Sequence, residues 1–104
     1  MKYYEIPNKI YKIWKEYAKA KAKYEMLSES RKSLLASLAS KFDGSEATKD
    51  RLARSSNEFK EFLYWLQQAR QYELELKYKL DSLTMHFEYF RSMNSLKKKE
   101  MELI

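Results

Sequence analysis

Apolar residues recur at alternating three- and four-residue intervals along two long stretches of this chain. In the first stretch, one repeating position holds Ile10, Tyr17, Tyr24, Arg31 and Leu38, and the other holds Ile13, Ala20, Leu27 and Leu34. In the second stretch, one position holds Phe62, Ala69, Leu76, Leu83 and Phe90, and the other holds Leu66, Glu73, Leu80, Phe87 and Asn94. Each repeat is sustained for about four heptads, which predicts two coiled-coil helices.

The composition supports a fold made only of helices. The chain of 104 residues contains 13 Leu but no Val, and it has one Gly and one Pro. A β-sheet needs β-branched residues for its strands and Gly, Pro or Asn for its turns, so these counts favour an all-α fold. The length is too short for two independent cores, and we therefore expect a single domain over residues 1–104.

Two points along the chain interrupt the helical pattern. Pro7 biases the residue before it away from helical dihedral angles, which predicts a short non-helical lead over residues 2–7 and Asn8 as the helix cap. Gly44 suits the left-handed position that ends a helix, and Ser45 can cap the next helix. The expected elements are a helix over about 8–42, a turn at 43–45, a short polar helix over about 46–54, and a long helix over about 57–100 that opens at the capping sequence 55–58.

The simplest arrangement of these elements is an antiparallel helical hairpin, because the two apolar seams match in length. Each seam carries one full charge near its middle, Arg31 in the first and Glu73 in the second. An unpaired buried charge is costly, whereas a complementary pair can fix the pairing of two helices at little net cost. We therefore predict an ion pair between Arg31 and Glu73.

The second long helix carries more apolar residues than one seam can bury. Leu74, Tyr78, Met85, Tyr89 and Leu96 form a second row along this helix, and we call four of them, Tyr78, Met85, Tyr89 and Leu96, the apolar stripe. The further surplus residues are Leu63, Trp65 and Tyr72 near the start of the second helix, and Trp14, Met26 and Leu35 on the first helix. An isolated hairpin would expose them as a large patch, so we expect a homodimer with four helices, held together through the apolar stripe. A groove for another protein and aromatic platforms for nucleic-acid bases are alternatives.

The net charge of +6 lies entirely in the first 42 residues, where ten Lys and Arg face four Asp and Glu. Residues 43–104 carry eleven of each sign. Lys12, Lys15, Lys19 and Lys23 follow three- and four-residue spacing, so they share one face of a helix, which we call the lysine face. Such a face attracts polyanions, although a simple solvated surface is the other interpretation.

The sequence offers little for catalysis, and we expect no enzyme activity, no cofactor and no metal site. The chain has no Cys, and His86 is its one histidine. Ser82 lies one helical turn before His86, but Asp81 points elsewhere on a helix and no glycine-rich turn supplies an oxyanion hole. One glycine also rules out a phosphate-binding loop. The longest apolar run is too short to span a membrane and the start lacks a signal peptide, so we expect a soluble, cytoplasmic protein.

The second half of the chain resembles a group of small helical proteins of tailed bacteriophages and prophages, which are often encoded among recombination and replication genes. The resemblance covers about residues 45–103 and lies in the polar segment 45–53, the segment 56–60 and the closing segment 91–103, which runs Arg-Ser-Met-Asn-Ser-Leu-Lys-Lys-Lys-Glu-Met-Glu-Leu. Members share a long first helix, a glycine-containing turn and this type of ending. The resemblance implies a phage origin, a bacterial host and a setting in DNA metabolism, but no activity.

Three functions are compatible with these features. The lysine face, the aromatic residues and the resemblance favour an accessory protein that associates with nucleic acid beside a phage recombination or replication factor. The surplus apolar residues favour a protein-binding module instead, for instance a phage inhibitor of a host defence complex. A structural coiled-coil spacer is the third possibility.

Overall fold

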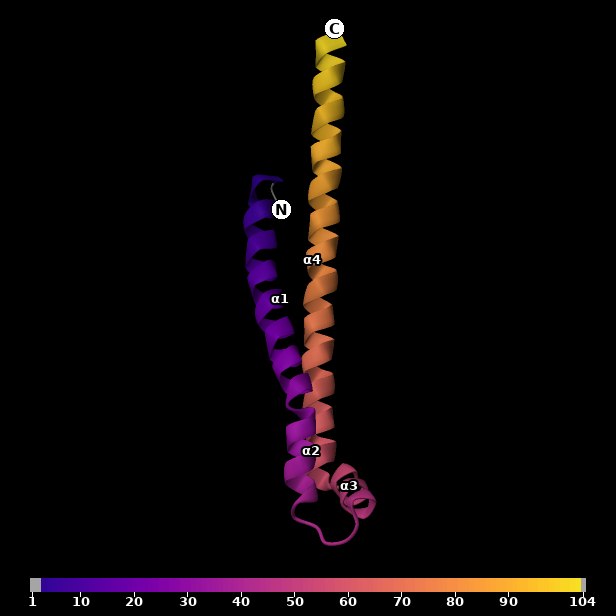
Figure 1. Ribbon diagram of the computed structural model, residues 1–104. Helices are drawn as coiled ribbons and strands as arrows, with labels where there is room; N and C mark the ends of the chain where they lie inside the picture. The colour runs from indigo at the N-terminus through magenta and orange to yellow at the C-terminus, as the bar shows by residue number, and fades with distance from the viewer. Residues whose placement is uncertain (1–2, 104) are drawn as a thin grey trace. The chain divides into compact units, whose positions relative to one another are not determined.

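The chain is helical almost throughout in the computed structural model, which describes residues 3–103 (Figure 1). A short 3-10 helix, η1 (Tyr3–Glu5), leads into α1 (Ile6–Glu29) and α2 (Arg31–Ala39). The short helix α3 (Glu46–Arg54) and the long helix α4 (Asn57–Leu103) complete the chain. The all-α fold predicted from composition and heptad spacing is therefore confirmed.

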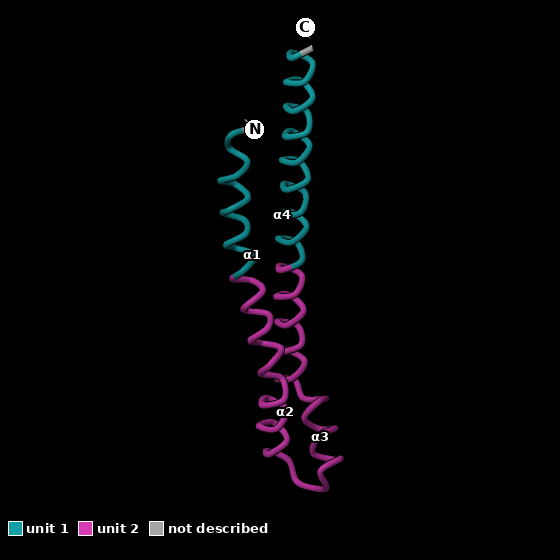
Figure 2. Tube along the Cα trace, turned by 45° about the horizontal axis from the view of Figure 1, so that its top comes forward, with its two compact units in different colours: residues 1–18, 74–104 teal, residues 19–73 magenta. Residues whose placement is uncertain are grey.

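The chain divides into two compact units, which Figure 2 distinguishes by colour. The first unit combines residues 1–18 with residues 74–104, and the second consists of residues 19–73. Because α1 and α4 each continue from one unit into the other, both units contain a part of each long helix. Within each unit these parts run antiparallel, as the hairpin prediction requires.

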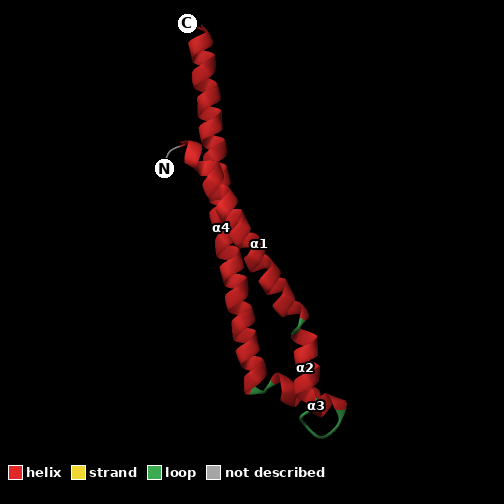
Figure 3. Ribbon diagram, turned by 90° about the vertical axis from the view of Figure 1, so that its left-hand side faces the viewer, coloured by secondary structure: helices red, strands yellow, loops and turns green. Residues whose placement is uncertain are grey.

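The second unit is a hairpin closed by α3 (Figure 3). Its core consists of Leu35 and Leu38 from α2, Ala53 from α3 and Phe59 from α4. Partly buried apolar residues extend this core on α2 and α4, namely Leu34, Ala39, Phe62 and Leu63. Removal of this apolar surface from water stabilises the closed end of the hairpin.

The turn before α3 confirms the predicted roles of positive φ at Gly44 and of the Ser45 cap, but Gly44 does not end the preceding helix, because α2 stops at Ala39. Gly44 has φ 122°, a backbone conformation that residues with a Cβ atom rarely adopt. The Ser45 side chain accepts a hydrogen bond of 3.2 Å from the backbone N–H of Thr48, as expected for the N-cap of α3. In the same way, Ser56 accepts a bond of 3.3 Å from the backbone N–H of Phe59 and caps α4. Both caps satisfy backbone donors that the helix itself leaves unpaired.

The first unit buries the predicted seams. The predicted seam residues Ile13 of α1 and Leu76 of α4 are buried, and so is Ile6, which the prediction places in the non-helical lead. The later seam residues of α4 are partly buried, namely Leu80, Leu83, Phe87 and Phe90. The heptad spacing therefore identified the face of α4 that is covered.

The predicted single helix over 8–42 differs from the structure at both ends and in the middle. Lys2 of the predicted lead lies outside the described residues, but α1 already begins at Ile6, so Asn8 is not its cap. Pro7 lies in the first turn, where its missing N–H would have had no helical partner. At the other end α2 stops at Ala39, and the turn occupies 40–45 instead of 43–45.

The break between α1 and α2 occurs at Ser30. The Ser30 hydroxyl donates a hydrogen bond of 2.8 Å to the carbonyl of Leu27, within its own preceding turn. A serine that bonds back in this way commonly bends a helix. Figure 3 shows the resulting change of direction between the end of α1 and α2.

The predicted ion pair between Arg31 and Glu73 is wrong. Glu73 is buried, but its carboxylate lies 3.0 Å from the guanidinium of Arg70, one turn earlier on the same helix. Arg31 is exposed, and its guanidinium carbon lies 5.8 Å from the centre of the Phe59 ring.

The reason for this difference is the position of α3. The prediction folded the chain within 43–56, whereas α3 packs against α2. The first turn of α4 is consequently level with Arg31. Glu73 lies 14 residues beyond Phe59, which is about 21 Å further along α4 at about 1.5 Å per residue.

Candidate nucleic-acid interface

All four residues of the lysine face lie on α1 with exposed side chains. Lys12 and Lys15 belong to the first unit, whereas Lys19 and Lys23 belong to the second. None of the four forms an ion pair with any residue in the described range 3–103. Lys15 makes a cation–π contact, in which its ammonium lies 5.4 Å from the centre of the Tyr11 ring.

Local sequence explains why these charges are unpaired. Ion pairs within a helix join residues three or four positions apart. At those distances each lysine has mostly another lysine, an alanine or an aromatic residue as its neighbour, and Glu16 is the one acid within reach. The positive charge of the lysine face therefore exceeds the negative charge that α1 places within reach of it.

A depression open to solvent lies at the start of this face. It measures about 430 Å³ and is lined by Tyr4, Glu5, Asn8, Lys9 and Lys12. Lys9 adds a further ammonium group beside Lys12, while Glu5 contributes the opposite charge. The depression thus extends the basic surface toward the beginning of α1.

The apolar stripe is exposed, as expected for an isolated chain. The exposed fractions of its four residues lie between 54% and 69%. At about 3.6 residues per turn their positions fall within about 40° of one another around α4, on the side opposite the buried seam. All four belong to the first unit.

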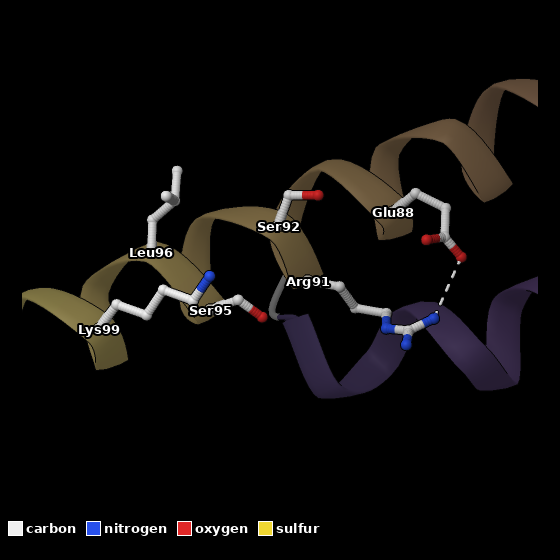
Figure 4. A pocket seen from close by; sticks show the side chains of 6 residues that line it. All are labelled: Glu88, Arg91, Ser92, Ser95, Leu96 and Lys99. Atoms are coloured by element: carbon white, nitrogen blue, oxygen red, sulfur yellow. Dashed lines mark hydrogen bonds and ion pairs between the residues drawn. The ribbon is translucent and has the colours of Figure 1, made fainter.

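A second depression borders the end of the apolar stripe (Figure 4). It measures about 410 Å³ and is lined by Glu88, Arg91, Ser92, Ser95, Leu96 and Lys99, all from α4. An ion pair of 3.3 Å between Arg91 and Glu88 closes one end, and the Arg91 guanidinium also lies 6.0 Å from the Phe87 ring centre.

The remaining surplus apolar residues divide into two groups. Leu35 is buried in the core cluster and Leu63 packs against it, so these two belong to the core and not to a surface patch, while Leu74 is partly buried. Trp65 stays exposed and packs edge-on against Tyr64, with ring centres 5.4 Å apart. The other large side chains that stay exposed are Trp14, Met26 and Tyr72.

His86 and the acidic residues show no catalytic arrangement within the part of the chain that the structure describes. The His86 ring packs edge-on against Phe90, with ring centres 4.8 Å apart. Across residues 3–103, no group of three or more His, Cys, Asp or Glu side chains is placed to hold a metal ion. The same residues include no helix that is long and apolar enough to cross a membrane.

Sequence reasoning missed the role of Arg70. Its guanidinium both pairs with the buried Glu73 and lies 5.2 Å from the centre of the Tyr24 ring of α1. The three-residue spacing between Arg70 and Glu73 was a signal for this pair.

Comparison of the chain with protein-family models, with curated proteins and with solved structures gives no match.

Proposed function

We propose that this protein is a non-enzymatic accessory protein that binds nucleic acid through the lysine face of α1. The observation that carries the proposal is the set of four exposed lysines without ion-pair partners among the described residues. The resemblance to small phage proteins supports a role beside recombination or replication factors.

The spacing of the lysines suits a phosphate backbone. Lys12 and Lys23 are 11 residues apart on α1, which corresponds to about 16 Å at about 1.5 Å per residue. Successive phosphates of one strand of duplex DNA advance by about 3.4 Å along its axis, so about five phosphates lie within this length. The lysine face is therefore long enough to contact more than one phosphate of the DNA backbone.

Binding of this kind derives its free energy from counterion release and carries no base preference. No carboxylate within residues 3–103 forms an ion pair with these ammonium groups, so they are accessible to an anionic ligand. The excess of positive charge in the first 42 residues also speeds the approach of a polyanion at low salt.

The proposal is tested by measuring the affinity for fluorescent single- and double-stranded DNA as a function of salt. Four phosphate contacts on duplex DNA give a slope of about 3.6 in log affinity against log salt, so affinity falls about 150-fold between about 50 and 200 mM salt. A variant with all four lysines changed to Gln should lose this dependence and keep the melting temperature, because the side chains are exposed.

A control variant changes four exposed lysines outside α1 to Gln, namely Lys32, Lys41, Lys60 and Lys79. Both variants lower the net charge from +6 to +2, so a specific role of the lysine face predicts a large loss of affinity in the first variant alone. Equal losses in both variants would contradict the proposal. Absence of DNA binding by the wild-type chain at about 50 mM salt would contradict it as well and would favour a protein ligand.

A further inference from the structure

We infer that the apolar stripe of α4 is the contact surface of an antiparallel homodimer, in which Tyr78 of each copy enters the depression beside Leu96 of the other. The inference concerns a different surface from the lysine face and does not depend on nucleic-acid binding. It rests on the spacing of the stripe, on the shape of the depression and on the charge at the end of α4.

The spacing of the apolar stripe is symmetric along the chain. Its residues are separated by intervals of seven, four and seven positions. When two copies of α4 run antiparallel about a twofold axis at residue 87, Tyr78 lies opposite Leu96 and Met85 lies opposite Tyr89. Ser82 and Ser92 occupy the two gaps and also lie opposite each other, where their small side chains let the helices approach. Each of the four residues of the apolar stripe then meets an apolar residue of the other copy.

The depression in Figure 4 has the form of a coiled-coil hole. Four of its lining residues follow the spacing i, i+3, i+4, i+7 on α4, namely Ser92, Ser95, Leu96 and Lys99. Four residues at this spacing form the hole that receives a side chain of the facing helix. The twofold axis derived from the stripe places the partner's Tyr78 opposite Leu96, which is one of the four residues around this hole.

Charge and side-chain size favour the antiparallel over the parallel arrangement. A parallel pair would bring together the two runs of Lys97, Lys98 and Lys99, whereas an antiparallel pair places them at opposite ends of the contact. The lysine runs of the two copies are then separated by about 20 residues of helix, or about 30 Å, which is well beyond the Debye screening length of about 10 Å. The antiparallel pair also sets each tyrosine against an aliphatic side chain, which keeps the layers similar in volume.

The exposed area is sufficient for a weak dimer. Tyr78 and Tyr89 are 66% and 60% exposed, and Met85 and Leu96 are 69% and 54% exposed. With roughly 100 Å² lost by each side chain, the four residues of two copies bury about 800 Å² before their flanks are counted. Specific interfaces start at about 1,000 Å², so we expect dissociation in the micromolar range.

Cysteine cross-linking tests the arrangement directly, because the chain contains no Cys. In the antiparallel dimer, Ser82 faces Ser92 of the partner, and facing Cα atoms of closely packed helices are roughly 5 Å apart, within reach of a disulfide. A mixture of Ser82→Cys and Ser92→Cys chains should therefore give the mixed dimer on oxidation, whereas neither variant should cross-link with itself. Self-cross-linking of each single variant would show a parallel pair and overturn the inference.

Sedimentation equilibrium provides the second measurement. The wild-type chain should approach twice its mass of 12.6 kDa at tens of micromolar. Tyr78→Ala should weaken association at least about tenfold, because two copies of this large side chain leave the contact, one beside Leu96 at each end. Tyr72→Ala is the matched control, since Tyr72 is exposed but lies off the stripe. A mass of 12.6 kDa up to about 100 μM would overturn the inference, and so would equal effects of the two variants.

Discussion

Replacement of Arg70 by Met should destabilise the fold much more than the same replacement of Arg31. Glu73 is only 4% exposed, and Arg70 is the partner that its carboxylate has in the structure. Without Arg70, the carboxylate would remain buried and uncompensated. Removal of one partner from a fully buried pair costs about 3–5 kcal/mol.

The expected loss of stability in Arg70→Met is smaller than that range, because the Arg70 side of the ion pair is exposed to solvent. The Arg70 side chain is 48% exposed, so water screens part of the attraction and can solvate the carboxylate after the change. We expect Arg70→Met to lower the free energy of unfolding by about 2 kcal/mol, including about 0.5 kcal/mol from the lost contact with the Tyr24 ring. Arg31→Met removes only the contact of an exposed guanidinium with the Phe59 ring and should cost less than about 1 kcal/mol.

A double-mutant cycle measured by urea unfolding separates the contributions. Glu73→Leu alone should be nearly neutral, because it replaces a buried charge with an apolar side chain and leaves Arg70 accessible to water. The double variant Arg70→Met with Glu73→Leu should recover most of the stability lost in Arg70→Met. Equal costs for Arg70→Met and Arg31→Met, or simple additivity of the two changes in the cycle, would refute the assignment of Arg70 as the partner of Glu73.

Two further changes test the closed end of the hairpin. Gly44→Ala should lower the free energy of unfolding by about 1–2 kcal/mol, because φ at this position is 122° and an added Cβ would lie 3.3 Å from the Thr48 side chain. An unchanged urea unfolding curve would show that the turn relaxes to accept the Cβ and would contradict this prediction. Leu38→Ala should cost about 2–4 kcal/mol, since Leu38 is buried in the cluster with Ala53 and Phe59. The exposed Met26 provides the control, and an effect of Met26→Ala as large as that of Leu38→Ala would contradict the assigned core.

The candidate sites were predictable to different degrees. Helical spacing alone predicted that Lys12 and Lys23 share a face, and the shortage of nearby acids predicted that they stay unpaired. The same spacing located the apolar stripe on the side of α4 away from the seam. The hole beside Leu96 required coordinates, because it depends on how the side chains of Ser92, Ser95 and Lys99 lie around it.

The amino-acid sequence by itself determined the all-α class, the two apolar seams and the turn at Gly44 and Ser45. These features follow from local rules, since heptad spacing selects a helix face and a positive φ selects glycine. Tertiary structure decided how the two seams are paired. A heptad repeat keeps the same apolar pattern when it is shifted by seven residues, so spacing alone does not choose among such shifts. Packing of Ala53 and Phe59 against Leu38 sets the level at which α4 begins, and Glu73 is thereby placed far from Arg31.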